Sequence, residues 1–181
     1  MPRMLVRAVT YSYYGLIATA TAHPCQFRQK DLANTVAEAL KQSGLAPQHL
    51  ELEITEGTAM ANAERAIRIL GELHGLGAKL SVDDFGTGYS SLAYLKRFPL
   101  DSLKIDRAFV VDIGTDVNSE AIMRATIALA QSLKLKVVAE GVETEAQRGF
   151  LARAGCDEMQ GYLFSRPLPA AEFLQLLARA G

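Results

Sequence analysis

The sequence predicts an α/β protein built around a parallel β-sheet. Short apolar runs alternate with amphipathic segments of helical period from residue 31 onward, and this alternation is typical of right-handed βαβ units. These runs are short and apolar, as expected for strands that are covered on both faces of a sheet. Acidic residues also recur where these runs end, which places them at one edge of a parallel sheet.

Capping and turn residues mark where the elements begin and end in the first half of this region. Asp31 can cap a helix through Lys41 that stops at a Ser-Gly pair, with Val36 and Leu40 on its apolar face. In the second helix, Leu70 and Leu73 take apolar positions of helical period. The elements expected after the first helix are a strand at 50–55, a helix at about 62–76, a strand at 79–83, a glycine-rich loop at 84–91 and a short helix near 92–96.

The same alternation continues to the end of the chain. The expected elements are a strand at 103–106, a helix at about 119–133, a strand at 136–140, a helix at 143–154, a strand at 159–164 and a closing helix at 170–180. No glycine fingerprint opens the first helix, which argues against a dinucleotide-binding protein.

The N-terminal segment differs from the rest. Tyrosines crowd within residues 11–14, residues 16–21 predict one strand, and Pro24 ends it. We therefore expect an atypical segment at 1–25, followed by the α/β portion at 26–181.

Composition excludes several classes of protein. The chain has 181 residues, 49% of them hydrophobic and 22% charged, which excludes wholesale disorder. The net charge of −1 argues against a DNA-binding face. Two cysteines cannot form a disulfide framework. No stretch predicts a membrane span or a convincing secretory signal, so a cytoplasmic location is expected.

Carboxylates end four successive predicted strands. Glu53 lies in the first, the pair Asp83 and Asp84 ends the second, Asp106 ends the third and Glu140 ends the fourth. One such residue would be interpreted as a helix cap, but several together repel unless a cation compensates them. Mg²⁺ and Mn²⁺ prefer such oxygen ligands. Two metals about 3.5–4 Å apart are a standard device for hydrolysing phosphate esters.

Lys104 adds a cation two residues before Asp106. It is either an ordinary salt-bridged strand lysine or a group that orients water or stabilises phosphate charge. The Gly-Thr-Gly sequence at 86–88 favours a structural loop beside the site over a phosphate-binding loop.

Six motifs in order resemble the EAL-domain phosphodiesterases, which hydrolyse cyclic di-GMP to linear pGpG. They are ELEITE at 51–56, DDFGTGYSSL at 83–92, LKIDR at 103–107, VAEGVE at 138–143, MQGYLF at 159–164 and RPLP at 166–169. The resemblance runs from about residue 26 to the end. It implies a TIM-like barrel with two Mg²⁺ or Mn²⁺ ions at its strand ends.

The resemblance also implies roles for individual residues. It assigns metal ligation to Glu53, Asp83, Asp84 and Glu140, with Asp83 as the bridge and Glu140 also catalytic. Lys104 would hold or activate the hydrolytic water. Asp106 and Gln160 would contact the nucleotide or waters of the site. The remaining residues would position the catalytic loop and support dimerisation; they are Glu56, Glu143, Phe85, Gly86, Thr87 and Gly88.

The chain departs from the family pattern at three places. Gly57 replaces the usual serine after Thr-Glu, and Thr21 stands where the family places an asparagine ligand. The Glu-Ala-Leu at 38–40 lies within the first helix, downstream of the family's signature strand, so Glu38 is expected on a helix surface instead of at a metal.

Length adds a further expectation. A TIM barrel needs about 250 residues, so we expect an incomplete (β/α) barrel of five or six strands that lacks the N-terminal strands. Its open edges would favour a homodimer. Three functions stay open: an impaired phosphodiesterase with an incomplete two-metal site, an inactive module that binds cyclic di-GMP or a protein partner, and a gene fragment without function.

Overall fold

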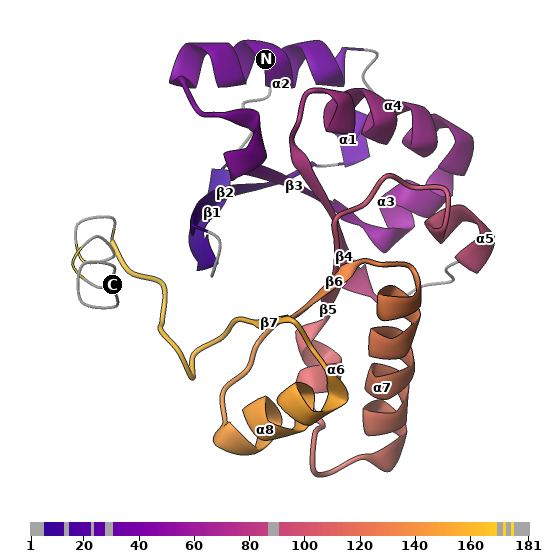
Figure 1. The fold of residues 1–181 in the computed structure, drawn as a ribbon, viewed down its shortest axis with the longest axis vertical. Helices are drawn as coiled ribbons and strands as arrows, with labels where there is room; N and C mark the ends of the chain where they lie inside the picture. The colour runs from indigo at the N-terminus through magenta and orange to yellow at the C-terminus, as the bar shows by residue number, and fades with distance from the viewer. Residues whose placement is uncertain are drawn as a thin grey trace.

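A curved sheet forms the centre of the structure, a computed structural model (Figure 1). It describes residues 6–12, 15–22, 24–27, 31–86, 91–169, 172 and 175. The seven strands follow chain order across the sheet. They are β1 (Val6–Ser12), β2 (Gly15–Thr21), β3 (Leu50–Thr55), β4 (Lys79–Phe85), β5 (Ser102–Ile105), β6 (Lys136–Ala139) and β7 (Glu158–Met159). Strands β2 to β7 are parallel, as expected for an incomplete TIM-like barrel, and β1 is antiparallel to β2.

Helices lie along the outer side of this curved sheet (Figure 1). They are α1 (Pro24–Phe27), α2 (Leu32–Ser43), a 3₁₀ turn (Pro47–His49), α3 (Glu56–Ala61), α4 (Ala63–Gly75), α5 (Leu92–Leu95), α6 (Arg107–Val111), α7 (Val117–Ser132) and α8 (Glu145–Ala154). Helix α4 packs on β4, and α7 packs on β5 and β6. Within the described residues, no helix is long and apolar enough to cross a membrane. Most of the closing helix expected at 170–180 lies outside those residues.

Local sequence explains the helix ends. Asn62 caps α4 by accepting from the backbone N–H of Arg65 at 3.1 Å, and Thr144 and Gln147 form a capping box at α8. Gly44 ends α2 with φ 69°, as predicted. Asp31 is the N-cap residue of α2, as predicted, but its carboxylate accepts from the side chain of Asn34 instead of a backbone N–H.

The two faces of the sheet differ in polarity, because side chains alternate along each strand. One face is apolar and fully buried in the core: Leu52, Ile54, Leu80, Val82, Leu103, Ile105, Val137 and Ala139. The other face is largely polar: Glu51, Glu53, Ser81, Asp83, Ser102 and Lys104. Strands β3 to β5 are covered on both faces, as expected, but one of these faces is polar and carries the predicted site residues.

The two ends of the sheet also differ from the prediction. Strand β2 matches the predicted strand at 16–21, but β1 was not predicted, because no Asn-Gly or Asp-Gly turn marks a hairpin there. Strand β7 stops at Met159 and a turn replaces the rest of the predicted strand at 159–164. Glu38 lies exposed on helix α2, as expected.

Gly161, in the turn after β7, allows two backbone segments to meet. A Cβ there would lie 2.2 Å from the carbonyl oxygen of Val142, and Val142 N donates to Gln160 O at 3.0 Å. We expect Gly161→Ala to lower the free energy of unfolding by about 1–3 kcal/mol, the usual cost of overpacking. Urea unfolding measures the change.

Gly57 provides the matched control, because a Cβ there would meet no described atom within 4 Å and the residue lies in helix α3. Gly57→Ala should leave stability unchanged or raise it by about 0.5–1 kcal/mol. Equal stability of the two variants would contradict a close approach at Gly161.

Candidate functional site

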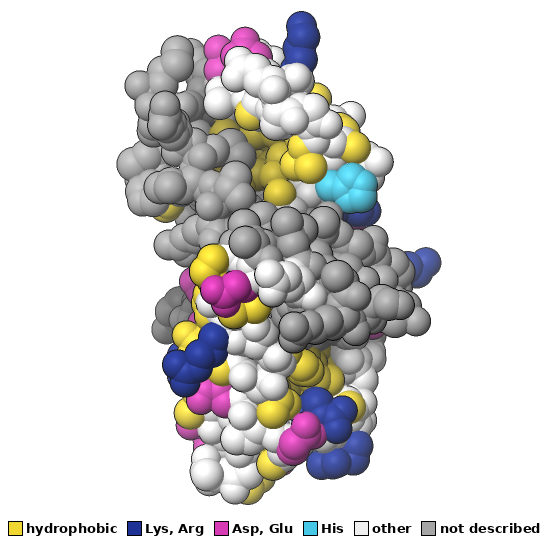
Figure 2. Space-filling model, turned by 90° about the vertical axis from the view of Figure 1, so that its left-hand side faces the viewer, with side chains coloured by type: hydrophobic (Ala, Val, Ile, Leu, Met, Phe, Trp, Pro, Cys, Tyr) yellow, Lys and Arg dark blue, Asp and Glu magenta, His cyan; other side chains and the backbone are white. Residues whose placement is uncertain are grey.

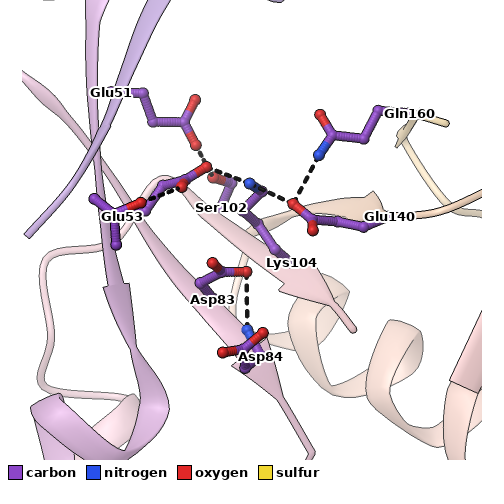
Figure 3. A network of polar contacts seen from close by, with 9 residues as sticks. Glu51, Glu53, Asp83, Asp84, Ser102, Lys104, Glu140 and Gln160 are labelled. Atoms are coloured by element: carbon purple, nitrogen blue, oxygen red, sulfur yellow. Dashed lines mark hydrogen bonds and ion pairs between the residues drawn. The ribbon is translucent and has the colours of Figure 1, made fainter. Parts of the chain in front are cut away.

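The polar face of the sheet gathers charged side chains at the carboxyl ends of its strands (Figure 3). Glu53 comes from β3, Asp83 and Asp84 from β4, and Lys104 from β5, while Glu140 follows β6. The parallel register places Thr55 opposite Asp83 and Lys104 opposite Val138. The carboxylates that sequence alone assigned to successive strands therefore lie around one point.

Lys104 is the centre of this arrangement. Its ammonium forms ion pairs with Oε1 of Glu53 and Oε1 of Glu140, and it thereby joins carboxylates from both sides of β5 (Figure 3). The side chains of Lys104 and Glu53 are only 8% and 7% exposed. Burial lowers the pKa of Lys104, but the carboxylates of Glu140 and Glu53 outweigh burial and raise this pKa above its usual value. The lysine is therefore charged.

Two neutral side chains complete the contacts of these glutamates. Thr21 at the end of β2 donates its hydroxyl to Oε2 of Glu53 at 3.1 Å. The Gln160 amide, just after β7, donates to Oε1 of Glu140 at 2.7 Å. The contact of Thr21 was not predicted, although the parallel register of β2 and β3 pairs Thr21 directly with Glu53.

Asp83 and Asp84 form a second acidic group beside the first. Asp84 donates its backbone N–H to Oδ1 of Asp83 at 2.9 Å, and it adopts the left-handed φ of 56°, which is uncommon for a residue other than glycine. Burial raises the pKa of both carboxyls, and the charge of Asp83 raises that of Asp84 further. The Asp106 carboxylate, which caps α6 by accepting from Ala108 N at 2.7 Å, also raises the pKa of Asp84.

Glu51 belongs to the same polar face and was missed by sequence reasoning. Its carboxylate accepts from the Ser102 hydroxyl at 3.3 Å, and burial raises its pKa. Glu51 lies two residues before Glu53 on the same strand, so the two-residue period of a strand places both on one face. That period was the available signal.

The residues assigned to loop positioning do not all lie together. Glu56 is 2% exposed, and its Oε2 accepts from the backbone N–H of Gly86 at 2.9 Å, directly after buried Phe85. Thr87 and Gly88 lie outside the described residues. Glu143 lies elsewhere, and it forms an ion pair with Arg107 at 2.7 Å.

The donor set suits a hard cation in its chemistry. All the acidic groups offer carboxylate oxygen, which Mg²⁺ and Mn²⁺ prefer. Burial raises the pKa of Asp83 and Glu140, Lys104 lowers it, and the neighbouring carboxylates raise it further. In the part of the chain that the structure describes, no three His, Cys, Asp or Glu side chains are already grouped to hold a metal. A cation would require side chains of the site to move.

Comparison with known proteins identifies the family. The sequence matches the EAL domain over residues 15–167. The chain belongs to the EAL domain family. The match begins at residue 15, so it includes β2 and Thr21 as well as the region from residue 26 that sequence analysis assigned to the family.

Relatives of this EAL chain include characterised proteins and solved complexes. Cyclic di-GMP phosphodiesterase NbdA of Pseudomonas aeruginosa is 55% identical over 146 residues, which are 81% of this chain and 19% of that protein. The PaMucR phosphodiesterase in complex with c-di-GMP has a TM-score of 0.86 and 46% identity, over 89% of this chain and 65% of that one. BlrP1 of Klebsiella pneumoniae, complexed with manganese and cy-diGMP, has a TM-score of 0.76 and 34% identity, over 83% of this chain and 39% of that one. The chain spans about a fifth of the length of the curated relatives that it matches first.

Proposed function

We propose that this EAL chain carries a cyclic di-GMP phosphodiesterase site that opens the cyclic dinucleotide to linear pGpG. The observation that carries the proposal is the buried Lys104 ammonium held between Glu53 and Glu140, with Asp83 and Asp84 beside it. Hydrolysis adds water across one phosphodiester: a water oxygen forms the new P–O bond, and the ribose oxygen leaves and gains a proton.

The acidic residues would hold divalent cations. By their chemistry and position, Glu53, Asp83, Asp84 and Glu140 are the ligands we assign, and Mg²⁺ or Mn²⁺ are the ions that suit them. Bound cations of this kind supply Lewis acidity toward the phosphoryl oxygens.

The neighbouring side chains would handle substrate and water. Lys104 is positively charged and largely buried, so its ammonium can orient the attacking water or stabilise the charge that develops on the phosphoryl group. Gln160 holds the carboxylate of Glu140 through its amide, and Asp106 lies beside Asp84 at the start of α6. We assign both a role in contacts to the nucleotide or to waters of the site.

The presence of Thr21 at this position leads us to expect slow turnover, and it also favours a second candidate function. The family places an asparagine ligand at this position, and a threonine hydroxyl that is donated to Glu53 replaces the amide oxygen. Loss of a ligand weakens a metal site. Binding of cyclic di-GMP without hydrolysis is therefore the alternative function, and the fragment without function predicts neither binding nor turnover.

An assay with cyclic di-GMP and MnCl₂ tests these functions. We expect slow formation of pGpG, measured by chromatography, that stops when EDTA is added. Thr21→Asn should raise turnover by about tenfold or more, because groups around a metal each typically contribute 10–100-fold to affinity or activity. Absence of pGpG at every metal concentration would exclude hydrolysis, and calorimetry with cyclic di-GMP would then separate binding from no function.

Assembly and location stay predictions of the sequence. The terminal strands β1 and β7 of the sheet each pair with one strand in the described region, which supports a homodimer that sedimentation velocity can measure. On the face in Figure 2, the described basic and acidic side chains are interspersed, which does not favour DNA binding by this face. A cytoplasmic location is proposed on composition alone.

A further inference from the structure

A side chain of the protein occupies the centre of the candidate metal site. The Lys104 ammonium contacts Oε1 of both Glu53 and Glu140, and Figure 3 shows it lying between the two carboxylates. Lys104 is 7% exposed and Glu53 is 6% exposed. A cation that approaches these glutamates therefore meets an ammonium that already forms an ion pair with each of them.

The other donors around these carboxylates strengthen this closed arrangement. Oε2 of Glu53 accepts from Thr21 at 3.1 Å, so each oxygen of Glu53 has a donor from the chain. Oε1 of Glu140 accepts from Gln160 at 2.7 Å in addition to Lys104. Metal coordination by either oxygen of Glu53, or by Oε1 of Glu140, must therefore replace a contact that the protein makes with itself.

We propose that the ammonium of Lys104 and a divalent cation compete for Glu53 and Glu140, so that metal binding displaces the lysine. The proposal rests on the proposed function for the nature of the ligand. Two positive groups at the same carboxylate oxygens repel each other strongly in a buried site, and one of them must leave. The carboxylates hold the ammonium until a metal arrives.

This competition has a consequence for the reaction. The displaced ammonium stays at the same strand end, because β5 pairs with β4 and β6 on either side of it. It becomes available to water or a phosphoryl oxygen only after the cation has taken its partners. Lys104 thus competes with the metal for Glu53 and Glu140, and it is the group that metal binding releases for catalysis.

Metal affinity in the absence of substrate tests the competition. Binding of MnCl₂ to the full chain is measured by calorimetry, and free Mn²⁺ is counted by its electron paramagnetic resonance signal. We expect Lys104→Met to bind Mn²⁺ about 5- to 150-fold more tightly than the wild type, the usual range of coupling between two sites. A residue that merely helped to assemble the site would give the opposite change.

Arg107→Met is the matched control. It also removes one positive charge near Glu140, but the Arg107 guanidinium contacts Glu143 and neither of the two central glutamates. Its Mn²⁺ affinity should stay close to that of the wild type. An equal gain in both variants would indicate a general charge effect and overturn the competition.

A second readout on the wild-type protein does not depend on the folding of a variant. The ¹⁵N signal of the Lys104 ammonium, recorded during titration with diamagnetic Mg²⁺, should change as the ion pairs break. An unchanged signal at saturating Mg²⁺ overturns the competition, as does equal or weaker Mn²⁺ binding by Lys104→Met, and both outcomes leave the proposed hydrolysis standing. Absence of Mn²⁺ binding by every variant overturns both proposals.

Discussion

Replacing Lys104 with methionine should lower the free energy of unfolding by about 3–5 kcal/mol when a chelator removes divalent cations. Methionine retains most of the apolar stem, but it leaves two carboxylates without a counter-ion. The Glu53 side chain is 7% exposed and that of Glu140 is 25% exposed, so water cannot replace the ammonium fully. Urea unfolding followed by circular dichroism measures the loss.

The effect should depend on pH with a definite sign. Burial lowers the pKa of Lys104, but Glu140 and Glu53 raise it above the ordinary 10.5, so in the wild type the pair stabilises fully below that pH and less as pH rises beyond it. Burial raises the pKa of Glu140 and Lys104 lowers it, so this pKa should rise further in Lys104→Met. The variant should therefore regain stability as pH falls from about 8 to about 5.

Lys79 offers a control at the opposite end of β4. Its ion pair with Asp101 is 2.8 Å long, but the Lys79 side chain is 48% exposed, so Lys79→Met should cost at most about 1 kcal/mol. If Lys104→Met were as stable as the wild type at about pH 8 in chelator, the buried ion pairs would contribute nothing to the free energy of unfolding. Addition of Mn²⁺ should restore more stability to Lys104→Met than it adds to the wild type, because the cation takes the place of the ammonium.

The layout of the site could be predicted from sequence because parallel strands end at one edge. Glu53 lies in a run of alternating residues, Asp83, Asp84 and Glu140 end apolar runs, and the topology of the sheet then brings them together. No side-chain contact was needed for that prediction. The same reasoning applied to the two-residue period of β3 would have added Glu51.

The role of Lys104 could not be predicted in the same way. Its ion pair with Glu53 joins strands that are not adjacent in the sheet, since β4 separates β3 from β5. The carboxylates that a lysine contacts depend on the direction of its aliphatic side chain and on the charges around it. Spacing alone therefore left a salt-bridged strand lysine and a catalytic group as alternatives; the structure shows the ion pairs, and the catalytic role is our proposal.

The short β7 has a physical cause that apolar periodicity does not reveal. Residues 159–164 have the β-type composition of a strand, but the backbone at Gly161 passes so close to Val142 that a Cβ would clash. The chain turns there, and Leu163 N donates to Val142 O at 3.0 Å. This turn fixes Gln160 next to Glu140, so the site gains its amide from the same feature that ends the strand.

Asp83→Asn should abolish turnover while preserving the fold. We expect formation of pGpG to fall by more than about 100-fold, because partners that only support a ligand already contribute 10–100-fold and Asp83 is assigned as the bridging ligand itself. The amide keeps an oxygen that can accept from Asp84 N, as Oδ1 of Asp83 does at 2.9 Å. The variant would therefore lose one negative charge from the site but keep the hydrogen bond between residues 83 and 84.

Stability should move in the opposite direction from activity. Burial raises the pKa of Asp83 despite the nearby Lys104, so the folded protein holds this charge at a cost at neutral pH, and the neutral amide should leave the melting temperature in chelator unchanged or higher. Glu72→Gln, which removes a carboxylate that is 43% exposed and pairs with Arg68 on helix α4, should alter neither quantity. If Asp83→Asn retained turnover, Asp83 would not be a metal ligand. If the variant had a lower melting temperature in chelator, the charge of Asp83 would stabilise the fold, and the negative charges of the site would be compensated without a metal.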